Sequence, residues 1–218
     1  MGVQITVRGS AEGRFPAERA LVRLEVVVEG AERQDVRDRA VALQEPLRSQ
    51  LGELVSLGAV RTWSSDQVRV FSRHPWVDDR RSDDLVHSAQ VQVLAEFVDF
   101  ERLSGFVDHW SGQAGVEVQG LEWDLGVKSR RVHEAEVRKA AVDDAVTKAQ
   151  SYADAVRRGR VTALELADPG MLDRPGDPGH GEPRAFALAS ADAGGAGLDL
   201  VPADIVIRVE VDARFQAE

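Results

Sequence analysis

The chain has 218 residues, enough for one sizeable core or two small domains. It carries 27 Lys and Arg against 37 Asp and Glu, a formal net charge of −10, which disfavours binding to nucleic-acid phosphates and to anionic membrane surfaces. It contains no cysteine, so disulfides, thiol catalysis and thiolate metal ligands are excluded.

The first residues, "MGVQITVRGSAEG", have neither the basic segment nor the apolar segment of a signal peptide. No run of about 18 apolar residues occurs, so the sequence predicts no transmembrane span. We therefore expect a cytoplasmic protein without a nucleic-acid partner.

Two strands are predicted at the start of the chain, over residues 3–13 and 20–29, where apolar and polar side chains alternate or valine dominates. The short connection between them contains Pro16 and predicts a hairpin. Leucines three or four positions apart predict a helix over 31–57. Pro46 is expected to kink this helix or to begin a second one.

The middle of the chain reads as a strand pair, 60–74 with 85–97, joined by the polar loop "PWVDDRRSDD". Gly58 is a plausible C-cap for the preceding helix, and Asp99 a plausible N-cap for the next. The remaining predicted elements are a helix over 99–112, a strand over 116–126, a helix over 128–157, a strand over 160–167 and a strand over 204–214.

Glycine and proline are dense between residues 168 and 200, which predicts a long mobile loop. The strand that follows must pair with strands formed much earlier, so we expect this loop to be an insertion within a single domain over 1–218. The element order ββαββαβαββ indicates an α+β fold with largely antiparallel sheet, one long alanine-rich helix and two further helical segments.

The helix over 128–157 has alanine where leucine is more usual. At about 100° per residue one half of it is apolar. That half holds Val137, Ala141, Val142, Ala145, Val146, Ala149, Tyr152, Ala153 and Val156, with Arg138 as an exception inside the arc. Small side chains let a helix axis approach a sheet closely, so this pattern predicts a buried packing helix rather than a ligand site.

The segment "VRKAAVDDAVTKAQSYA" resembles the pattern "ARxxAxxxAxxKAxxxA" of the bacterial SIMPL-domain family, a family of unknown function. The matching positions are Arg138, Ala141, Ala145, Lys148, Ala149 and Ala153. The start of the chain, from Gly9 to Ala20, is similar to the family's "GxG" and "PDxAxxxxxV" segments, although Ala17 replaces the aspartate. "LVSLGAVRTWSSDQVRV" echoes a third family segment, "lxxlGixxxdixTxxxxv".

The resemblance covers most of the chain and implies a SIMPL-like fold with a tendency to self-associate. It supplies no catalytic residues and no cofactor. Many relatives, such as those like the 28-kDa outer-membrane protein, carry leader peptides and act at the cell envelope, whereas this chain resembles a leaderless member.

The sequence contains no compact metal or catalytic motif. The five histidines do not form HExxH, and neither G-x-S-x-G nor a phosphate-binding Gly-rich loop is present. The acidic loop residues lack the EF-hand spacing and glycine, and a hydrated hairpin tip explains them. Those carboxylates are Asp78, Asp79, Asp83 and Asp84, and the histidines are His74, His87, His109, His133 and His180.

Trp76 lies in the predicted polar hairpin tip, between Pro75 and Val77, where an exposed aromatic side chain can anchor an interface. Unpaired strand edges can also join chains. We therefore expect a non-enzymatic, homo-oligomeric or protein-binding module with no cofactor. Two alternatives remain open: a small-molecule-binding protein with the 168–200 loop as a lid, and a hydrolase with an unrecognised site near His87, His109 or His133.

Overall fold

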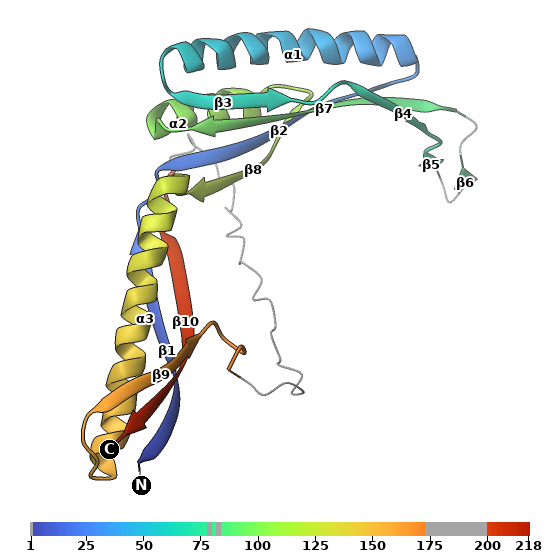
Figure 1. Cartoon of the computed structure of the whole chain (residues 1–218). Helices are drawn as coiled ribbons and strands as arrows, with labels where there is room; N and C mark the ends of the chain where they lie inside the picture. Colours follow the sequence, from blue (N-terminus) through green and yellow to red (C-terminus); the bar gives the residue numbers. More distant parts are fainter. Residues whose placement is uncertain (1, 78–79, 82–83, 173–199) are drawn as a thin grey trace. The chain divides into compact units, whose positions relative to one another are not determined.

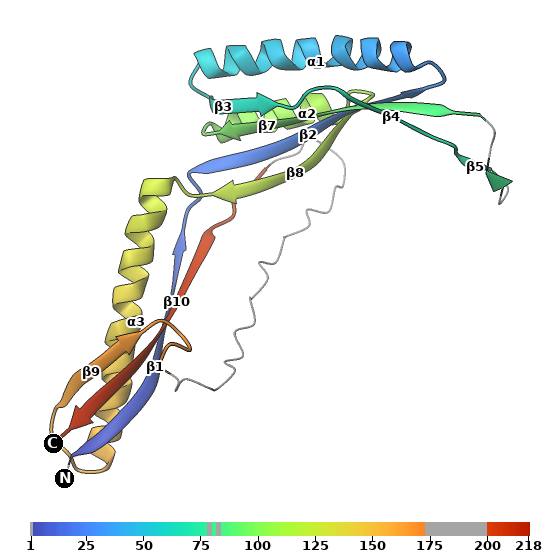
Figure 2. The same ribbon diagram turned by 45° about the vertical axis from the view of Figure 1, so that its right-hand side comes forward.

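A computed structural model describes residues 2–77, 80–81, 84–172 and 200–218. The chain divides into two compact units (Figures 1 and 2). The terminal unit contains Met1–Phe15, Gly126–Ala193 and Asp204–Glu218, and the central unit contains Pro16–Leu125 and Gly194–Ala203. Whether the two units behave as the single domain expected from the sequence stays a prediction. Most of the predicted loop, residues 173–199, lies outside the described residues.

The terminal unit is a three-stranded antiparallel sheet in the order β1 (Val3–Phe15), β10 (Ile205–Ala217), β9 (Val161–Ala167). β1 and β10 pair without interruption from Val3↔Ala217 to Phe15↔Ile205. The late strand therefore does return to an early one, as its position in the sequence required. Helix α3 (Val127–Ala155) runs along the sheet (Figure 1).

The central unit is an antiparallel sheet in the order β3 (Val60–Ser65), β7 (Val86–Phe97), β2 (Arg19–Gly30), β8 (Val116–Asp124). β4 (Arg69–Arg73) also pairs with β7, and the short strands β5 (Trp76–Val77) and β6 (Arg80–Arg81) pair with each other.

Helices α1 (Arg33–Ser56) and α2 (Phe100–Ser111) share one core with alternate side chains of β2 and β7. The indole Nε1–H of Trp110 on α2 also donates to Gln50 Oε1 on α1 at 2.7 Å. Burial alternates along β2. Val22, Leu24 and Val26 face the helices and are fully buried, whereas Arg23, between Val22 and Leu24, is exposed. One face of this sheet is therefore covered by helices.

Three details of the predicted fold are wrong in whole or in part. β1 and β2 do not form a hairpin, because β1 pairs with β10 and β2 pairs with β7 and β8. Pro46 does not begin a second helix, because α1 continues through it, and the kink that was the other alternative stays a prediction. The predicted strand over 60–74 is two strands, β3 and β4, because the ladder to β7 is interrupted between them.

The predicted helix ends are confirmed in kind. Gly58 has φ +73°, a backbone conformation that residues with side chains rarely adopt. The next residue, Ala59, donates its N–H to Leu54 O at 2.9 Å, so the helix ends at a glycine. Asp99 caps α2, since its Oδ1 accepts from Arg102 N–H at 3.0 Å. Within the described residues, no helix is long and apolar enough to cross a membrane.

Candidate interaction surface

The alanine stripe of α3 packs against the sheet of the terminal unit. Ala141, Ala145, Ala149 and Ala153 are fully buried and, with Val137, recur every four residues. A Cβ added to Gly9 on β1 would lie 2.0 Å from Ala141 O and 2.7 Å from Ala145 Cβ. The glycine and the alanines together therefore set how near the helix lies to the sheet.

The contact is narrower than the sequence indicated. Val146, Tyr152 and Val156, predicted to be in the packed half of the helix, are 40%, 61% and 54% exposed. A sheet of only three strands covers little more than one row of helix side chains, and α3 is the one helix of this unit within the described residues. Arg138, inside the predicted apolar arc, is also exposed.

Lys148 has a separate role, because it and Asp144 form hydrogen bonds with backbone groups of β1. Lys148 Nζ donates to Arg8 O at 3.0 Å, and Asp144 Oδ2 accepts from Ser10 N–H at 2.8 Å. The two side chains also pair with each other at 2.6 Å. Lys148 and Ser10 N–H hold the pKa of Asp144 below its usual range. These backbone groups of an edge strand are therefore occupied within the chain.

The opposite edge of the same sheet, on β9, has a different surface. Its residues from Thr162 to Leu166 are all exposed, and Leu164 and Leu166 are 49% and 54% exposed. Its one charged residue, Glu165, pairs with Arg214 of β10 at 2.7 Å. The ladder to β10 shifts register opposite Arg214 and Phe215, which leaves Leu164 as an extra residue on β9.

The two edges of the central sheet carry charges instead. β3 and β4 present Arg61, Arg69 and Arg73, and β8 presents Glu117 and Glu122, all of them exposed. Charged side chains on an edge strand discourage the addition of another strand. Phe71 on β4 is also 42% exposed, but it lies between Arg69 and Arg73. On β9, the residue between Leu164 and Leu166 is Glu165, which is paired within the chain.

The most buried charges of the central unit form an ion-pair cluster around Arg19. Arg19 Nε donates to Asp124 Oδ2 at 2.9 Å, and its Nη1 lies 3.3 Å from Glu96 Oε1. Arg61 Nε approaches the same Glu96 oxygen at 3.4 Å, so this buried atom is compensated by charge although it lacks a well-directed hydrogen bond. Burial lowers the pKa of Arg19, but the bonds to Asp124 and Glu96 outweigh it and raise that pKa overall. The cluster fastens β2 to its neighbours and leaves these carboxylates paired.

The predicted contact at Trp76 stays a prediction. The backbone of Trp76 and Val77 forms β5, but their side chains lie outside the described residues. Pro75 is partly buried. Three of the acidic loop residues, Asp78, Asp79 and Asp83, also lie outside the described residues, as does His180.

The histidines of the hydrolase alternative have different partners. His87 Nδ1 lies 2.7 Å from Ser72 Oγ, and His133 Nδ1 lies 3.2 Å from Glu136 Oε2 while its ring stacks on Phe15. The ring of His109 meets that of its neighbour Trp110 edge-on. A catalytic triad needs one histidine with both a hydroxyl and a carboxylate partner. Here the hydroxyl contacts His87 in the central unit, and the carboxylate contacts His133 in the terminal unit. Among the described residues, no group of three or more metal-ligating side chains is present.

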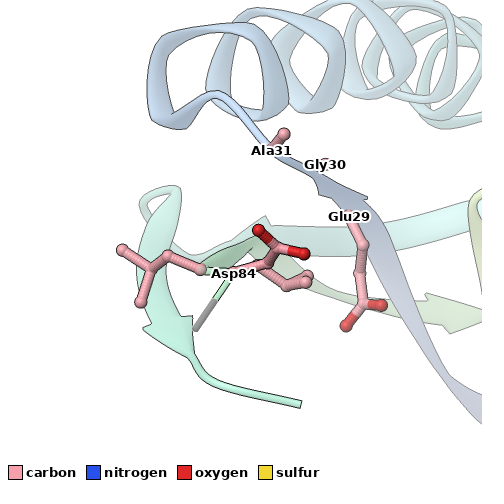
Figure 3. A pocket seen from close by; sticks show the side chains of 6 residues that line it. Glu29, Gly30, Ala31 and Asp84 are labelled. Carbon is pink, nitrogen blue, oxygen red and sulfur yellow. The ribbon is translucent and has the colours of Figure 1, made fainter. Parts of the chain in front are cut away.

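A shallow hollow lies at the end of β2 and the segment leading into β7 (Figure 3). Glu29, Gly30, Ala31, Asp84, Leu85 and Val86 line it. Arg73 Nη2 donates to both carboxylate oxygens of Glu29, at 3.1 and 3.3 Å. The lid of the small-molecule alternative was predicted over 168–200, and most of that range lies outside the described residues.

Comparison with known proteins decides the family. The family model SIMPL, described as a protein of unknown function (DUF541), matches residues 5–215 and thus nearly the whole chain. The chain belongs to the SIMPL family. No curated protein matches it. The SIMPL match includes all the helices and strands described above except the first two residues of β1 and the last two of β10, and so contains the alanine stripe and β9.

Proposed function

We propose that this SIMPL-family protein is a non-enzymatic module that acts by binding protein, in the first place further copies of itself. The observation that carries this proposal is the apolar surface of the terminal unit around β9, with Leu164 and Leu166 about half exposed. Exposed apolar side chains on a strand edge are typical of surfaces that pair with another chain.

Two further features support an interaction role over catalysis. The buried charges around Arg19 are paired with one another, so they are not poised for proton transfer. The hollow at Glu29 has its carboxylate occupied by Arg73. Exposed aromatic side chains can anchor interfaces, so we also retain Trp76, flanked by Pro75 and Val77, as a proposed second contact.

Size-exclusion chromatography with light scattering tests the proposal on the full chain, at concentrations from about 1 to 100 μM, which span micromolar dissociation constants. A mass above that of the 23.8 kDa monomer that falls on dilution is the expected result. A monomer across the whole range contradicts self-association. The variant Trp76→Ala is measured beside it, and a lower association for that variant alone would place the hairpin tip in the contact.

A further inference from the structure

Among the strands that the structure describes, β9 pairs only with β10, and its other edge points to a particular partner. We infer that β9 pairs antiparallel with β9 of a second copy across a two-fold axis, joining two three-stranded sheets into one of six strands. This inference rests on the proposed self-association and specifies its surface and its geometry. An isologous contact of this kind closes on itself and gives a dimer.

The choice of β9 follows from how each sheet edge is protected. Asp144 and Lys148 occupy backbone groups of Arg8 and Ser10 on the β1 edge. The two edges of the central sheet carry exposed arginines or glutamates, and the exposed Phe71 on β4 is flanked by Arg69 and Arg73. β9 has a bulge at Leu164, but its edge carries two half-exposed leucines and no unpaired charge.

The choice of a second copy follows from charge. The chain has a net charge of −10, so identical surfaces generally repel one another. β9 is an exception, because its single charged residue, Glu165, is neutralised by Arg214 of the same chain. A basic partner strand would find no unpaired carboxylate there. A second β9 supplies instead the apolar side chains that match Leu164 and Leu166.

The register can be stated as well. Pairing centred on Leu164 places Leu164 opposite its copy, Ala163 opposite Glu165 and Thr162 opposite Leu166. No glutamate then faces a glutamate, and the leucines of both copies lie together on the joined sheet. A centre on Glu165 would set two like charges opposite each other, which destabilises a strand pair.

Helix α3 extends the apolar surface beside this edge. Gln150 on α3 holds the start of β9, since its Oε1 accepts from Val161 N–H at 3.1 Å and its Nε2 donates to Gly159 O at 3.1 Å. Val146 lies one helical turn before Gln150 and so on the same side of α3. Its 40% exposed side chain adds apolar area next to β9.

The absence of cysteine from the sequence makes a direct test possible. Single cysteines are placed in turn at residues 162 to 166, and the full chain is oxidised mildly at a concentration where light scattering shows an oligomer. Side chains directly opposite across an antiparallel pair have Cβ atoms about 4.5–5.5 Å apart, close to disulfide geometry. Thr162 and its copy, four positions out of register, would be separated by roughly 13 Å.

We expect Leu164→Cys to give a covalent dimer at least about tenfold faster than Thr162→Cys. Leu57→Cys is the matched control, because Leu57 is 61% exposed but lies in the central unit. It should cross-link no faster than Thr162→Cys. In parallel, Leu164→Lys, which sets two ammonium groups opposite each other, should weaken association at least about tenfold, and Leu57→Lys should leave it unchanged.

The possible failures are distinct. A wild-type chain that is monomeric at all concentrations overturns the proposed function together with this inference. An oligomer that forms no cross-link from any position between 162 and 166, and that survives Leu164→Lys, overturns the β9 contact alone. An oligomer that loses association in Trp76→Ala but not in Leu164→Lys places the interface on the hairpin tip instead.

Discussion

The two units of this molecule solve the same packing problem with side chains of opposite size. In the central unit, α1 and α2 fill the space above the sheet with leucine and aromatic side chains, among them Leu47, Leu51 and Phe106, all buried. In the terminal unit, α3 presents alanines to a sheet whose Gly9 has no side chain. One core is therefore held by apolar volume and the other by close approach of backbones.

This difference predicts different weak points. Removing volume should damage the central unit most, whereas adding even one methyl group should damage the terminal unit. All four tryptophans, at positions 63, 76, 110 and 123, lie in the central unit, and the single tyrosine, Tyr152, lies in the terminal unit. Tryptophan fluorescence therefore follows the central unit, while far-UV circular dichroism follows both.

The largest effect is expected from Phe106→Ala in the central unit. Phe106 is 1% exposed and packs on Phe97 with ring centroids 5.0 Å apart. Truncation leaves a cavity and should cost about 3–5 kcal/mol of unfolding free energy. Urea denaturation followed by tryptophan fluorescence measures this cost. A loss below about 1 kcal/mol would contradict a core held by volume.

A somewhat smaller loss is expected from Gly9→Ala in the terminal unit. The new Cβ would meet Ala141 O at 2.0 Å, and because this atom is backbone the helix must move away. Overpacking of this kind costs about 3 kcal/mol, the upper part of its usual range. Circular dichroism during denaturation should show the loss.

Gly52→Ala is the matched control for that variant. Gly52 lies within α1, and a Cβ added there meets no atom within 4 Å. The same substitution should therefore stabilise the chain by about 0.5–1 kcal/mol.

If Gly9→Ala also shifted the tryptophan transition by the same amount as the circular dichroism transition, the two units would unfold as the single domain predicted from the sequence.

A smaller effect is expected from acid, and it should be confined to the terminal unit. The hydrogen bond from Arg8, helped by Gly170 N–H, holds the pKa of Asp212 below its usual range despite partial burial. A lowered pKa in the folded state adds stability above the unfolded value of about 3.9, and that stability is lost as pH falls through the folded value. The melting temperature of the terminal unit should therefore fall below about pH 4.

Asp212→Asn should remove part of this dependence, because the variant no longer loses a charge on acidification. Asp38→Asn, an exposed position on α1, should keep the wild-type slope. Equal slopes for all three proteins would show that the Arg8–Asp212 pair does not contribute to the pH dependence.

Local patterns in the sequence predicted the elements well but their partners less well. Leucine spacing located α1, and the alanine repeat located α3, because helix periodicity is a local property. The pairing of β1 with β10 joins residues about 200 positions apart. The short connection at Pro16 between two predicted strands indicated a hairpin, but β1 pairs with β10 instead.

The candidate surface was only partly visible in the sequence. The alanine motif and Lys148 could be named, but the contacts of Lys148 with Arg8 O and of Asp144 with Ser10 N–H depend on the strand that lies beside the helix. β9 was predicted as a strand without any role, because the periodicity of "RVTALELA" does not say whether a neighbour covers both of its edges. Edge position is a property of the whole sheet.

The central claim is that the β1 edge of the terminal sheet bonds within the chain, whereas the β9 edge bonds to a second chain. Hydrogen exchange measured by mass spectrometry, above and below the dissociation constant, tests this claim most directly. The amides of residues 162–166 that point away from β10 should be protected in the oligomer and lose protection on dilution. Ser10 N–H, held by Asp144, should stay protected at both concentrations. Exchange on β9 that is independent of concentration, in a protein that does self-associate, would contradict it.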